Sequence, residues 1–209
     1  MALIDSKYRE LVNSVHHHDL QKFKQILCQS DYHPRLCAYS KTKDTLIHVI
    51  AQLGFVEFLE FIASQFPEDI KELFECKNVD GKTPLHEAAQ FSQTDIITFL
   101  LVHNVQVDPI KKADWTPLML ACTKTGKESQ KSINMLISKG ADLMLQNKVL
   151  IYYLCYSHSF HEILIFLIPY NIYRYEISTY ICYKELPMSF LLKHYICNSL
   201  FRTGGHLYT

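Results

Sequence analysis

Residues 80–89 read DGKTPLHEAA, and residues 113–122 repeat this stretch in altered form as ADWTPLMLAC. The threonines at its centre are Thr83 and Thr116, and a proline follows each of them. A threonine before a helix accepts a hydrogen bond from an unpaired amide of the first turn. Proline suits the first helical position because no N–H is needed there. The pattern therefore predicts a helix that begins after each threonine, and the interval from Thr83 to Thr116 is its repeat period.

A helix start that recurs after about 33 residues is typical of ankyrin repeats, in which each unit consists of a turn and two helices. We therefore predict an all-α fold, an ankyrin-repeat solenoid of about four helix–turn–helix units with turn or β-hairpin fingers. The predicted units are an N-terminal capping repeat at 1–40, three further repeats at 41–78, 79–111 and 112–148, and a non-repeat tail at 149–209.

The first two units depart most from the repeated stretch. Apolar spacing predicts two helices in the first unit, from Lys7 to about Val15 and from Asp19 to about Gln29. In the second unit Thr45 is not followed by proline, and the interval from Thr45 to Thr83 is longer than the repeat period. Insertions in solenoids occur in loops, so we assign the additional residues to a longer loop at 66–71.

The last two units are predicted to end their second helices at residues that tolerate a left-handed backbone. The second helix of the third unit should open near Thr94 and stop at Asn104, and the fourth unit has Gly140 at its end. A small insertion is predicted between the two helices of the fourth unit, at 126–128. The positions expected to face inward are Ile96, Ile97, Leu100, Leu101, Ile133, Leu136 and Ile137.

Charge and cysteine content limit the classes of function. In 209 residues, 21 Lys and Arg balance 21 Asp and Glu, so any contact with a polyanion would have to be local. Seven cysteines, an odd number without a Cys-x-x-Cys pair, favour reduced thiols in an intracellular protein. Residues 1–7 do not have the pattern of a secretory signal. We expect a cytoplasmic protein, with the nucleus as a second location.

Metal-binding and catalytic motifs are not expected. His16, His17 and His18 are adjacent, but neighbouring residues at a helix end point in different directions, and no cysteine or carboxylate cluster completes a ligand set. The sequence has no Gly-rich phosphate loop, no His-Glu-x-x-His and no Gly-x-Ser-x-Gly. We therefore predict no metal, no cofactor and no catalytic residue.

Residues 149–209 differ in composition from the repeats. They contain no Ala, Asp or Gln, and they hold 10 of the 13 tyrosines. One interpretation is a second domain, and another is a membrane segment, although the apolar run at 163–168 is too short to span a bilayer. Our preferred hypothesis is readthrough of AT-rich intron sequence. An intron that begins at the Val149 codon would support it, and an uninterrupted exon through Thr209 would contradict it.

Four segments are more particular than the general repeat pattern. They are VDPIKKADWTPLMLACT at 107–123, GKTPLHEAA at 81–89, GAD at 140–142 and LQNK at 145–148. Together they resemble the ankyrin repeat domain-containing protein 16 family over about residues 7–148. Members of that family continue into further repeats where this chain enters its tail. The resemblance implies a partner of alanyl-tRNA synthetase that helps to prevent serine from being placed at alanine codons.

By the same resemblance, Lys112 and Lys148 accept misactivated serine, and a third acceptor lysine belongs to a repeat that this chain lacks. A neutral amine can attack the carbonyl of seryl-adenylate and form an amide. An exposed lysine with a pKa near ~10.4 is mostly protonated at pH 7, so we expect a stoichiometric trap and not an enzyme that turns over. Without the resemblance, both lysines would be interpreted as solvated residues in polar turns.

The predicted partner is a protein that contacts the turn tips and the inner helices, with no direct binding to nucleic acid and no membrane contact. The residues assigned to partner binding are Lys82, Lys111, Asp114 and Trp115. Trp115, the only tryptophan, is predicted to lie at a turn tip where it cannot be deeply buried. It would either anchor an interface or pack over the neighbouring turn.

Other repeated residues are interpreted as structural. His48 and His86 share one repeat position, and we expect them to tie neighbouring turns together by hydrogen bonds and not to catalyse a reaction. The remaining structural positions are Thr45, Thr83, Pro84, Thr116, Pro117 and Gly140. Two alternatives stay open beside the synthetase partner: a generic ankyrin scaffold for another protein, and a truncated product without function.

Overall fold

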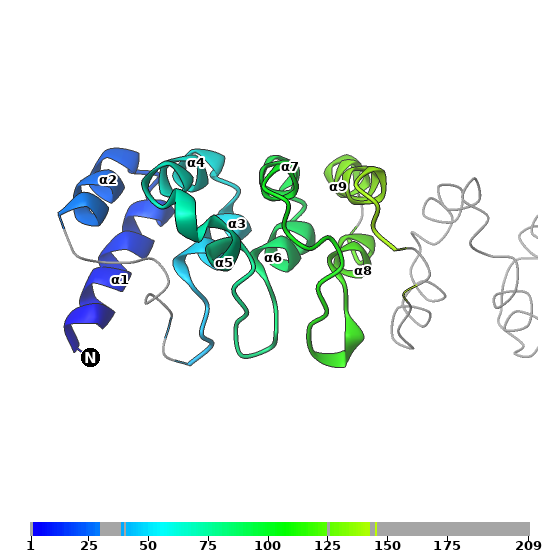
Figure 1. Cartoon of the computed structure of the whole chain (residues 1–209), viewed down its shortest axis with the longest axis horizontal. Helices are drawn as coiled ribbons and strands as arrows, with labels where there is room; N and C mark the ends of the chain where they lie inside the picture. The colour runs from blue at the N-terminus through cyan, green and yellow to red at the C-terminus, as the bar shows by residue number, and fades with distance from the viewer. Residues whose placement is uncertain (1, 30–38, 40, 125, 143–144, 146–209) are drawn as a thin grey trace, which may run out of the picture. The chain divides into compact units, whose positions relative to one another are not determined.

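The computed structural model describes residues 2–29, 39, 41–124, 126–142 and 145. Within them the helices are α1 (Ala2–His16), α2 (Leu20–Cys28), α3 (Leu46–Leu53), α4 (Val56–Gln65), the 3-10 helix η2 (Pro67–Asp69), α5 (Ile70–Phe74), α6 (Pro84–Gln90), α7 (Thr94–Val102), the 3-10 helix η3 (Lys112–Asp114), α8 (Pro117–Cys122) and α9 (Lys127–Ser138). Figure 1 shows α1, α3, α6 and α8 in one row and α2, α4, α7 and α9 in a second row above it.

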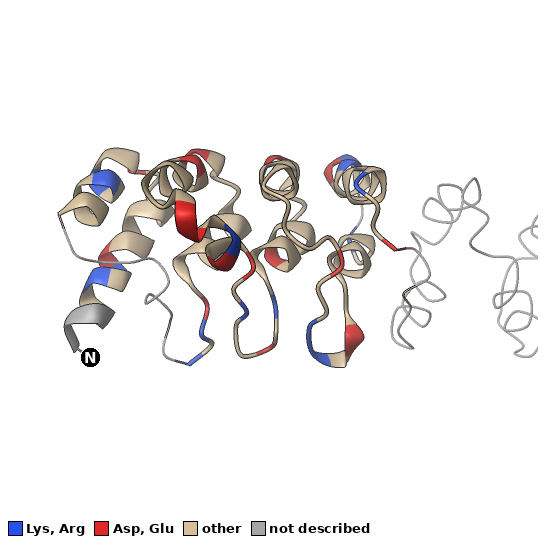
Figure 2. Cartoon of the chain, in the orientation of Figure 1, with Lys and Arg blue, Asp and Glu red and all other residues tan. Residues whose placement is uncertain are grey.

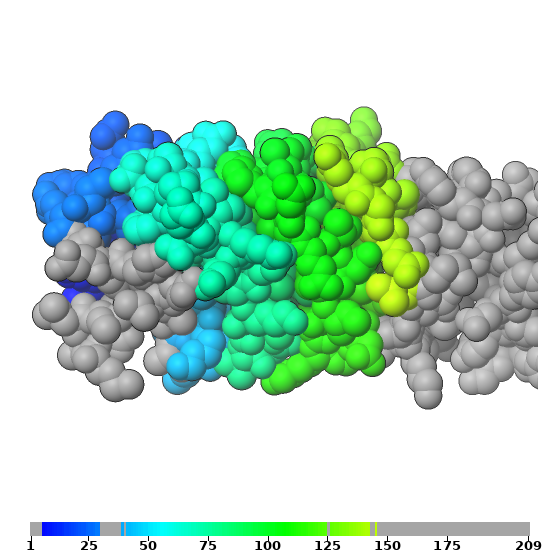
Figure 3. All heavy atoms as spheres, viewed as in Figure 1, coloured from blue at the N-terminus to red at the C-terminus, as the bar shows by residue number. Residues whose placement is uncertain are grey.

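Contacts within and between the rows build the fold. The inner row, defined here as α1, α3, α6 and α8, packs each helix on the next, and each of these helices also contacts the outer helix that follows it in the chain. The repeats therefore lie side by side in chain order, as their surfaces show in Figure 3. This arrangement confirms the predicted all-α solenoid of helix–turn–helix units.

Turns that we call fingers precede three of the inner helices: the first finger (41–45), the second (77–82) and the third (110–115). The second finger closes where the N–H of Asn78 donates to the carbonyl oxygen of Lys82 at 3.0 Å, and the third where the N–H of Lys111 donates to that of Trp115 at 3.1 Å. Lys111 and Trp115 form an isolated β-bridge, and the described residues contain no strand. The predicted fingers are therefore turns.

The inner helices begin where the sequence predicts. Thr45, Thr83 and Thr116 each precede the first residue of α3, α6 and α8, respectively. Pro84 and Pro117 occupy the first position of α6 and α8, where the absent N–H costs nothing. At α8 the hydroxyl oxygen of Thr116 accepts a hydrogen bond from the N–H of Met119 at 3.3 Å.

Left-handed backbone recurs at fixed repeat positions. Asn104 has φ 56° and Gly140 has φ 88°, which confirms both predicted helix ends. Two residues before each capping threonine, Lys43 (φ 58°), Gly81 (φ 74°) and Asp114 (φ 58°) are also left-handed. Glycine suits position 81 because L side chains rarely adopt this backbone conformation, whereas the space around a Cβ there would allow an ordinary contact with Lys111.

The core lies between the two rows of helices. Ile96, Ile97, Leu100 and Leu101 of α7 and Ile133 and Leu136 of α9 are buried as predicted, and Ile137 is half-buried. Between α2 and α4 the rings of Phe23 and Phe58 meet edge to face, with centroids 4.9 Å apart. Each such side chain stabilises the fold by about 1.5–3 kcal/mol through burial.

The predicted loop at 66–71 is wrong. Phe66 caps α4, and the residues after it form η2 and the start of α5, because Pro67 opens a helical turn and apolar residues of α5 can be buried. Leu73 and Phe74 of α5 are almost fully buried, and the ring of Phe74 contacts Phe99 of α7 at a centroid distance of 5.6 Å. The additional residues thus extend the core and not only the surface.

Two helix boundaries also differ from the prediction. Lys127 and Glu128 do not form an insertion between helices but the first turn of α9, which has 12 residues where α7 has 9. The additional residues of the fourth unit are therefore absorbed as most of one helical turn. The first helix begins at Ala2, earlier than the predicted Lys7.

The interpretation of residues 149–209, and the assignment of Lys148, lie outside the described residues. Among the helices that the structure describes, none is long and apolar enough to cross a bilayer.

Candidate functional site

His48 connects the second repeat to the second finger. Its Nδ1 accepts a hydrogen bond from the N–H of Thr45 at 3.2 Å, and its Nε2 lies 2.9 Å from the carbonyl oxygen of Lys82. Because the amide can only donate and the carbonyl can only accept, the ring is neutral with its proton on Nε2. Burial lowers the pKa of His48, which favours this neutral form.

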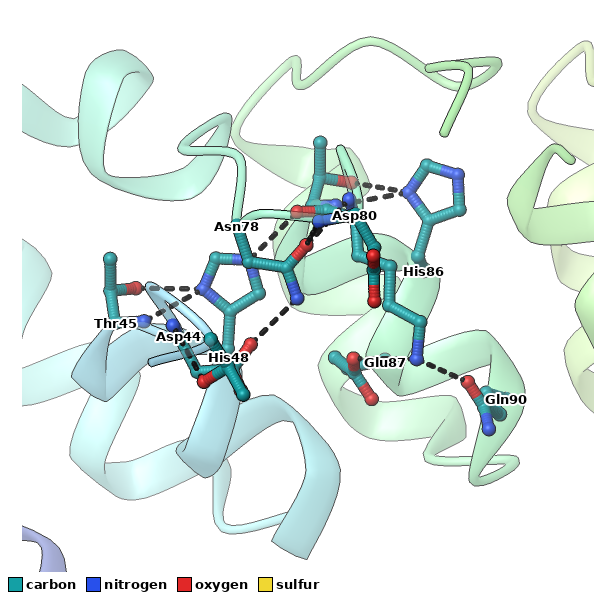
Figure 4. A network of polar contacts seen from close by, with 11 residues as sticks. Asp44, Thr45, His48, Asn78, Asp80, His86, Glu87 and Gln90 are labelled. Atoms are coloured by element: carbon teal, nitrogen blue, oxygen red, sulfur yellow. Dashed lines mark hydrogen bonds and ion pairs between the residues drawn. The ribbon is translucent and has the colours of Figure 1, made fainter. Parts of the chain in front are cut away.

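His86 makes the equivalent connection one repeat later. Its Nδ1 accepts from the N–H of Thr83 at 3.1 Å, and its Nε2 donates to the carbonyl oxygen of Trp115 at 3.1 Å. Burial lowers the pKa of His86 to about 4, against the hydrogen bond to Trp115, which raises it. Both histidines therefore tie neighbouring turns together by hydrogen bonds, and Figure 4 shows the ring of His48 beside Thr45.

Direct contacts between fingers reinforce these links. The N–H of Val79 donates to the carbonyl oxygen of Thr42, and the N–H of Lys112 donates to that of Asp80, both at 2.9 Å. The side-chain amide of Asn78 also donates to Asp44 Oδ1 at 2.7 Å (Figure 4). The three fingers are therefore hydrogen-bonded to one another in sequence, which presents them as one surface.

A buried thiol lies beside His48 but is not activated. Cys76 Sγ is 3.8 Å from His48 Nδ1, and its S–H donates to the carbonyl oxygen of Leu73 at 2.9 Å. Burial raises the pKa of Cys76 to about 11, whereas a cysteine nucleophile needs a thiolate near neutral pH. This cysteine–histidine pair therefore belongs to the link between repeats.

Lys82, predicted to bind a partner, is held within the molecule. Its Nζ lies 3.0 Å from Glu87 Oε1 and 2.8 Å from Gln90 Oε1, and its side chain is 20% exposed. The backbone of Lys82 closes the second finger, where its carbonyl oxygen accepts from the N–H of Asn78. Its ammonium group, however, points along α6 toward the two residues that it pairs with.

Lys112, the described candidate for accepting serine, lies at the tip of the third finger. Its side chain is 65% exposed, and its Nζ forms an ion pair with Asp80 Oδ1 of the second finger at 3.2 Å. The ion pair uses the charged ammonium, whereas attack on an acyl-adenylate requires the neutral amine. Access is therefore present at Lys112, but its ion pair with Asp80 has to open before the amine can attack.

Lys111 has the more unusual environment of the two adjacent lysines. Its Nζ lies 5.5 Å from the ring centroid of Trp115, a cation–π distance. Burial lowers the pKa of Lys111, and the nearby charge of Lys82 lowers it further. The sequence assigned Lys111 to partner binding and Lys112 to serine acceptance, but it gave no sign of the contact between Lys111 and the Trp115 ring, because that contact depends on how Trp115 packs.

The predicted exposure of Trp115 is wrong. The side chain is only 9% exposed and packs in an apolar cluster with Met119 and Leu120, against which Leu145 also lies. Of the two interpretations left open, the contacts support local packing. At the tip, Ala113 (φ 64°) and Asp114 (φ 58°) both adopt left-handed backbone, and Asp114, which the sequence assigned to partner binding, is exposed.

A groove runs along the inner helices, and Phe91 lies in it. One hollow of about 270 Å³ is lined by Asp44, His48, Val49, Gln52, Lys82, Glu87, Gln90 and Phe91. A second, of about 380 Å³, is lined by Gln90, Phe91, Ser92, Lys124, Gly126, Lys127, Glu128 and Ser129. The two hollows share Gln90 and Phe91, so we define them together as the Phe91 groove.

Phe91 is 41% exposed, which is unusual for a phenylalanine. The sequence predicted contacts through the inner helices but did not single out Phe91. The available signal was a phenylalanine directly after the Gln90 end of α6, at the position before the left-handed Ser92 (φ 57°).

The three adjacent histidines do not converge. His17 Nδ1 contacts the carbonyl oxygen of Asn13 at 2.7 Å, while His18 stacks on Phe55 at 4.1 Å between ring centroids and pairs with Glu57. His18 therefore joins the first repeat to the second. Among the described residues, no group of three potential ligands is placed to hold a metal ion.

Comparison with known proteins agrees with this architecture. The family described as "Ankyrin repeats (3 copies)" matches residues 11–101 and, in an overlapping match, residues 47–147. The transient receptor potential cation channel subfamily A member 1 of Drosophila melanogaster is 25% identical over 103 residues. That match covers 49% of this chain and 8% of the channel's length, so the chain spans only a small part of this relative.

Proposed function

This chain belongs to the ankyrin repeat family, and on that premise we propose that it is a protein-interaction module whose binding surface is the Phe91 groove together with the three fingers. The single observation that carries the proposal is the exposed Phe91, which lines both of the adjoining hollows. Exposed aromatic side chains in a concave surface are typical anchors of protein interfaces.

The fingers support this choice of surface. Hydrogen bonds through His48, His86 and the finger backbones fix three turns of different repeats relative to one another. A surface that is ordered before binding loses less conformational entropy when a partner docks.

For the partner we propose alanyl-tRNA synthetase, on the resemblance carried by residues 81–89, 107–123, 140–142 and 145–148. The module would act in the cytoplasm, or also in the nucleus, and lower the placement of serine at alanine codons. Lys112 would serve as an acceptor of misactivated serine, in a stoichiometric reaction that begins only when the synthetase displaces the ion pair to Asp80.

A binding measurement tests the surface and the partner together. The full chain is titrated against alanyl-tRNA synthetase by surface plasmon resonance, as wild type, Phe91→Ala and Val102→Ala. Val102 is a matched control, because it is an apolar residue of α7 that is 61% exposed and lies outside the groove. We expect Phe91→Ala to weaken binding about tenfold and Val102→Ala to leave it unchanged.

Equal affinity of wild type and Phe91→Ala would contradict the groove as the interface. Absence of binding by the wild-type chain would contradict the synthetase as the partner.

A second measurement tests the acceptor lysine. The chain is incubated with the synthetase, ATP and serine, and Lys112 is examined for a seryl amide by peptide mass spectrometry, with Lys112→Arg as the control. We expect the adduct on Lys112 in the wild type only. An unmodified Lys112 under conditions that form seryl-adenylate would contradict the trapping activity and leave the interaction module intact.

The second candidate function is a generic ankyrin scaffold for a different protein. The observation that favours it is the match to a cation channel subunit, whose name has no connection with a synthetase. This second function predicts that Phe91→Ala weakens binding to a protein other than the synthetase.

A further inference from the structure

Three lysines gather where the second and third fingers meet α6. The fingers are in contact there, because the N–H of Lys112 donates to the carbonyl oxygen of Asp80 at 2.9 Å. Figure 2 shows residues of both charges on these two fingers. We define the finger cluster as the charged residues that act on one another here: Asp80, Lys82, Glu87, Lys111 and Lys112.

Both carboxylates of the finger cluster are already paired. Glu87 Oε1 lies 3.0 Å from Lys82 Nζ, and Asp80 Oδ1 lies 3.2 Å from Lys112 Nζ. Among the residues that the structure describes, no carboxylate is within ion-pair distance of Lys111 Nζ. Lys111 is therefore the lysine of the cluster that has no carboxylate partner.

An aromatic ring takes the place of a carboxylate beside Lys111. The side chain is half-buried, and its Nζ lies 5.5 Å from the ring centroid of Trp115. The ring excludes water from one side of the ammonium, although its attraction for a cation opposes that effect in part. The contact thus holds the amine at a defined place on the surface of the third finger.

The charges around Lys111 act in both directions. Burial and then the charge of Lys82 lower the pKa of Lys111, whereas Asp80 and Glu87 raise it. His86 of α6 also lies near Lys111 but stays neutral, because burial lowers its pKa to about 4. The overall shift is downward, so Lys111 has a larger neutral fraction than an ordinary exposed lysine.

We propose that Lys111 is an acylation site of this chain, at which the side-chain amine accepts an acyl group directly from a thioester such as an acyl-coenzyme A. The inference goes beyond the proposed function, because it requires no partner protein and concerns a different lysine from the serine acceptor Lys112.

The reaction is a transfer between two nucleophiles. The neutral Nζ of Lys111 attacks the carbonyl carbon of the thioester, a C–N bond forms, and the C–S bond breaks. The thiolate leaves with the electron pair of that bond, and the proton that the nitrogen releases goes to the thiolate or to water. The products are an amide on Lys111 and a free thiol.

Exposure alone would favour a different lysine. The side chain of Lys112 is 65% exposed, but its ammonium is paired with Asp80. Lys82 is 20% exposed and contacts both Glu87 and Gln90. Lys111 alone in the finger cluster combines partial access with the lack of a carboxylate partner, so the three residues separate reactivity from exposure.

The experiment follows the free full-length chain in millimolar acetyl-coenzyme A at pH 8, without any enzyme. Samples are denatured at intervals, and the remaining amines are capped with deuterated acetic anhydride. Cleavage before Asp108 and Asp114 then releases residues 108–113, which contain both Lys111 and Lys112. Fragment-ion mass spectrometry measures the acetylated fraction of each. We expect Lys111 to react about threefold faster than Lys112.

A substitution at Lys82 tests the cause of the reactivity. Lys82→Met removes the neighbouring positive charge and frees Glu87 to pair with Lys111, so it should slow acetylation of Lys111 about threefold. Lys43→Met, in the first finger, removes one lysine away from the finger cluster and should leave the rate unchanged. Circular dichroism checks that both variants are folded.

Three results would overturn the inference: Lys112 acetylated as fast as Lys111 or faster, no acetylation of Lys111, or an unchanged rate at Lys111 in folded Lys82→Met. None of these results bears on the synthetase or on the Phe91 groove, because the free chain is the only protein in the assay. Loss of synthetase binding would likewise leave the acylation site unaffected.

Discussion

His48 and His86 lie three residues after the threonines that precede α3 and α6, whereas Met119 occupies the same position in α8. The two histidines hydrogen-bond the backbone of the next finger. Met119 instead joins an apolar cluster with Trp115 and Leu120. One repeat position thus holds the array together by two different kinds of interaction.

The difference shows how the third finger is fixed. Its Trp115 carbonyl accepts a hydrogen bond from His86 of the preceding repeat, while its Trp115 side chain packs on Met119 of the same repeat. A hydrogen bond specifies the position of the backbone, and the buried ring supplies most of the stabilising free energy. The two contributions can therefore be separated by mutation and by pH.

The largest expected effect comes from the apolar side of this comparison. Trp115→Ala should lower the free energy of unfolding by about 3 kcal/mol, because it removes a buried ring and leaves a cavity beside Met119 and Leu120. Trp115→Phe should cost less than about 1.5 kcal/mol. Urea denaturation followed by circular dichroism measures both. A cost below ~1 kcal/mol for Trp115→Ala would show that the ring is not part of the core.

The next effect is the pH dependence of the hydrogen-bonded side. The unfolded chain protonates His86 near pH 6.5, while the folded chain resists protonation until about pH 4. Stability is therefore full above pH 6.5 and falls as the pH is lowered from 6.5 toward 4, by about 3 kcal/mol for this residue. The lowered pKa of His48 acts in the same direction.

Urea midpoints at pH 7, 6, 5 and 4.5 test this dependence in wild type and in His86→Met, the residue that the fourth repeat uses. The variant should lose most of the acid sensitivity assigned to His86. Identical pH profiles for the two proteins would contradict a neutral, buried His86.

A smaller effect is expected from the same substitution at equivalent positions. At pH 7, His86→Leu should cost about 2 kcal/mol, because the N–H of Thr83 and the carbonyl oxygen of Trp115 both lose a partner. Met119→Leu should cost less than about 1 kcal/mol, since it replaces one buried apolar side chain by another. Denaturant titration of the two variants side by side measures the difference, and equal costs would remove the distinction between the two kinds of link.

The smallest effect concerns a second hydrogen-bonded link between neighbouring repeats. It is made by Glu75 and Asp108, which lie eight positions before Thr83 and Thr116, respectively. Glu75 accepts from the N–H of Gln106, and Asp108 accepts from the N–H of Asp142, both at 2.8 Å. Asp108 Oδ1 is buried and has no hydrogen-bond partner among the described residues, and burial raises the pKa of Asp108. The ionised carboxylate therefore costs stability above the pH range in which an unfolded aspartate titrates.

Asp108→Asn keeps an acceptor for Asp142 and removes this charge, so it should change stability at pH 7 by less than about 1 kcal/mol, in the stabilising direction. Thermal denaturation at pH 7 checks the sign. A destabilisation larger than ~1 kcal/mol would mean that the charge of Asp108 is required.

Much of this architecture could be predicted from the sequence because it depends on local rules. The threonine–proline pairs marked the starts of α6 and α8, and Asn104 and Gly140 marked helix ends, since each of these residues satisfies a backbone requirement by itself. The histidine links could be predicted as well, because His48 and His86 recur at one repeat position.

The packing of Trp115, the partners of Lys82 and the surroundings of Phe91 could not be predicted, because they depend on contacts between side chains of different elements. Trp115 packs in a cluster that Leu145, which follows α9 in the chain, also contacts. The partners of Lys82 are Glu87 and Gln90 on the following helix, which no turn rule specifies. Phe91 forms part of a groove only once α3, α6 and the start of α9 are brought together.

Hydrogen–deuterium exchange of the full chain, with and without its bound partner, tests the central claim most directly. The account predicts that the partner slows exchange in α6, in α8 and in the three fingers, with the strongest protection around Phe91, and leaves α4 and α7 unchanged. Protection confined to α4 and α7, with α6 and the fingers unaffected, would contradict the inner surface as the binding site.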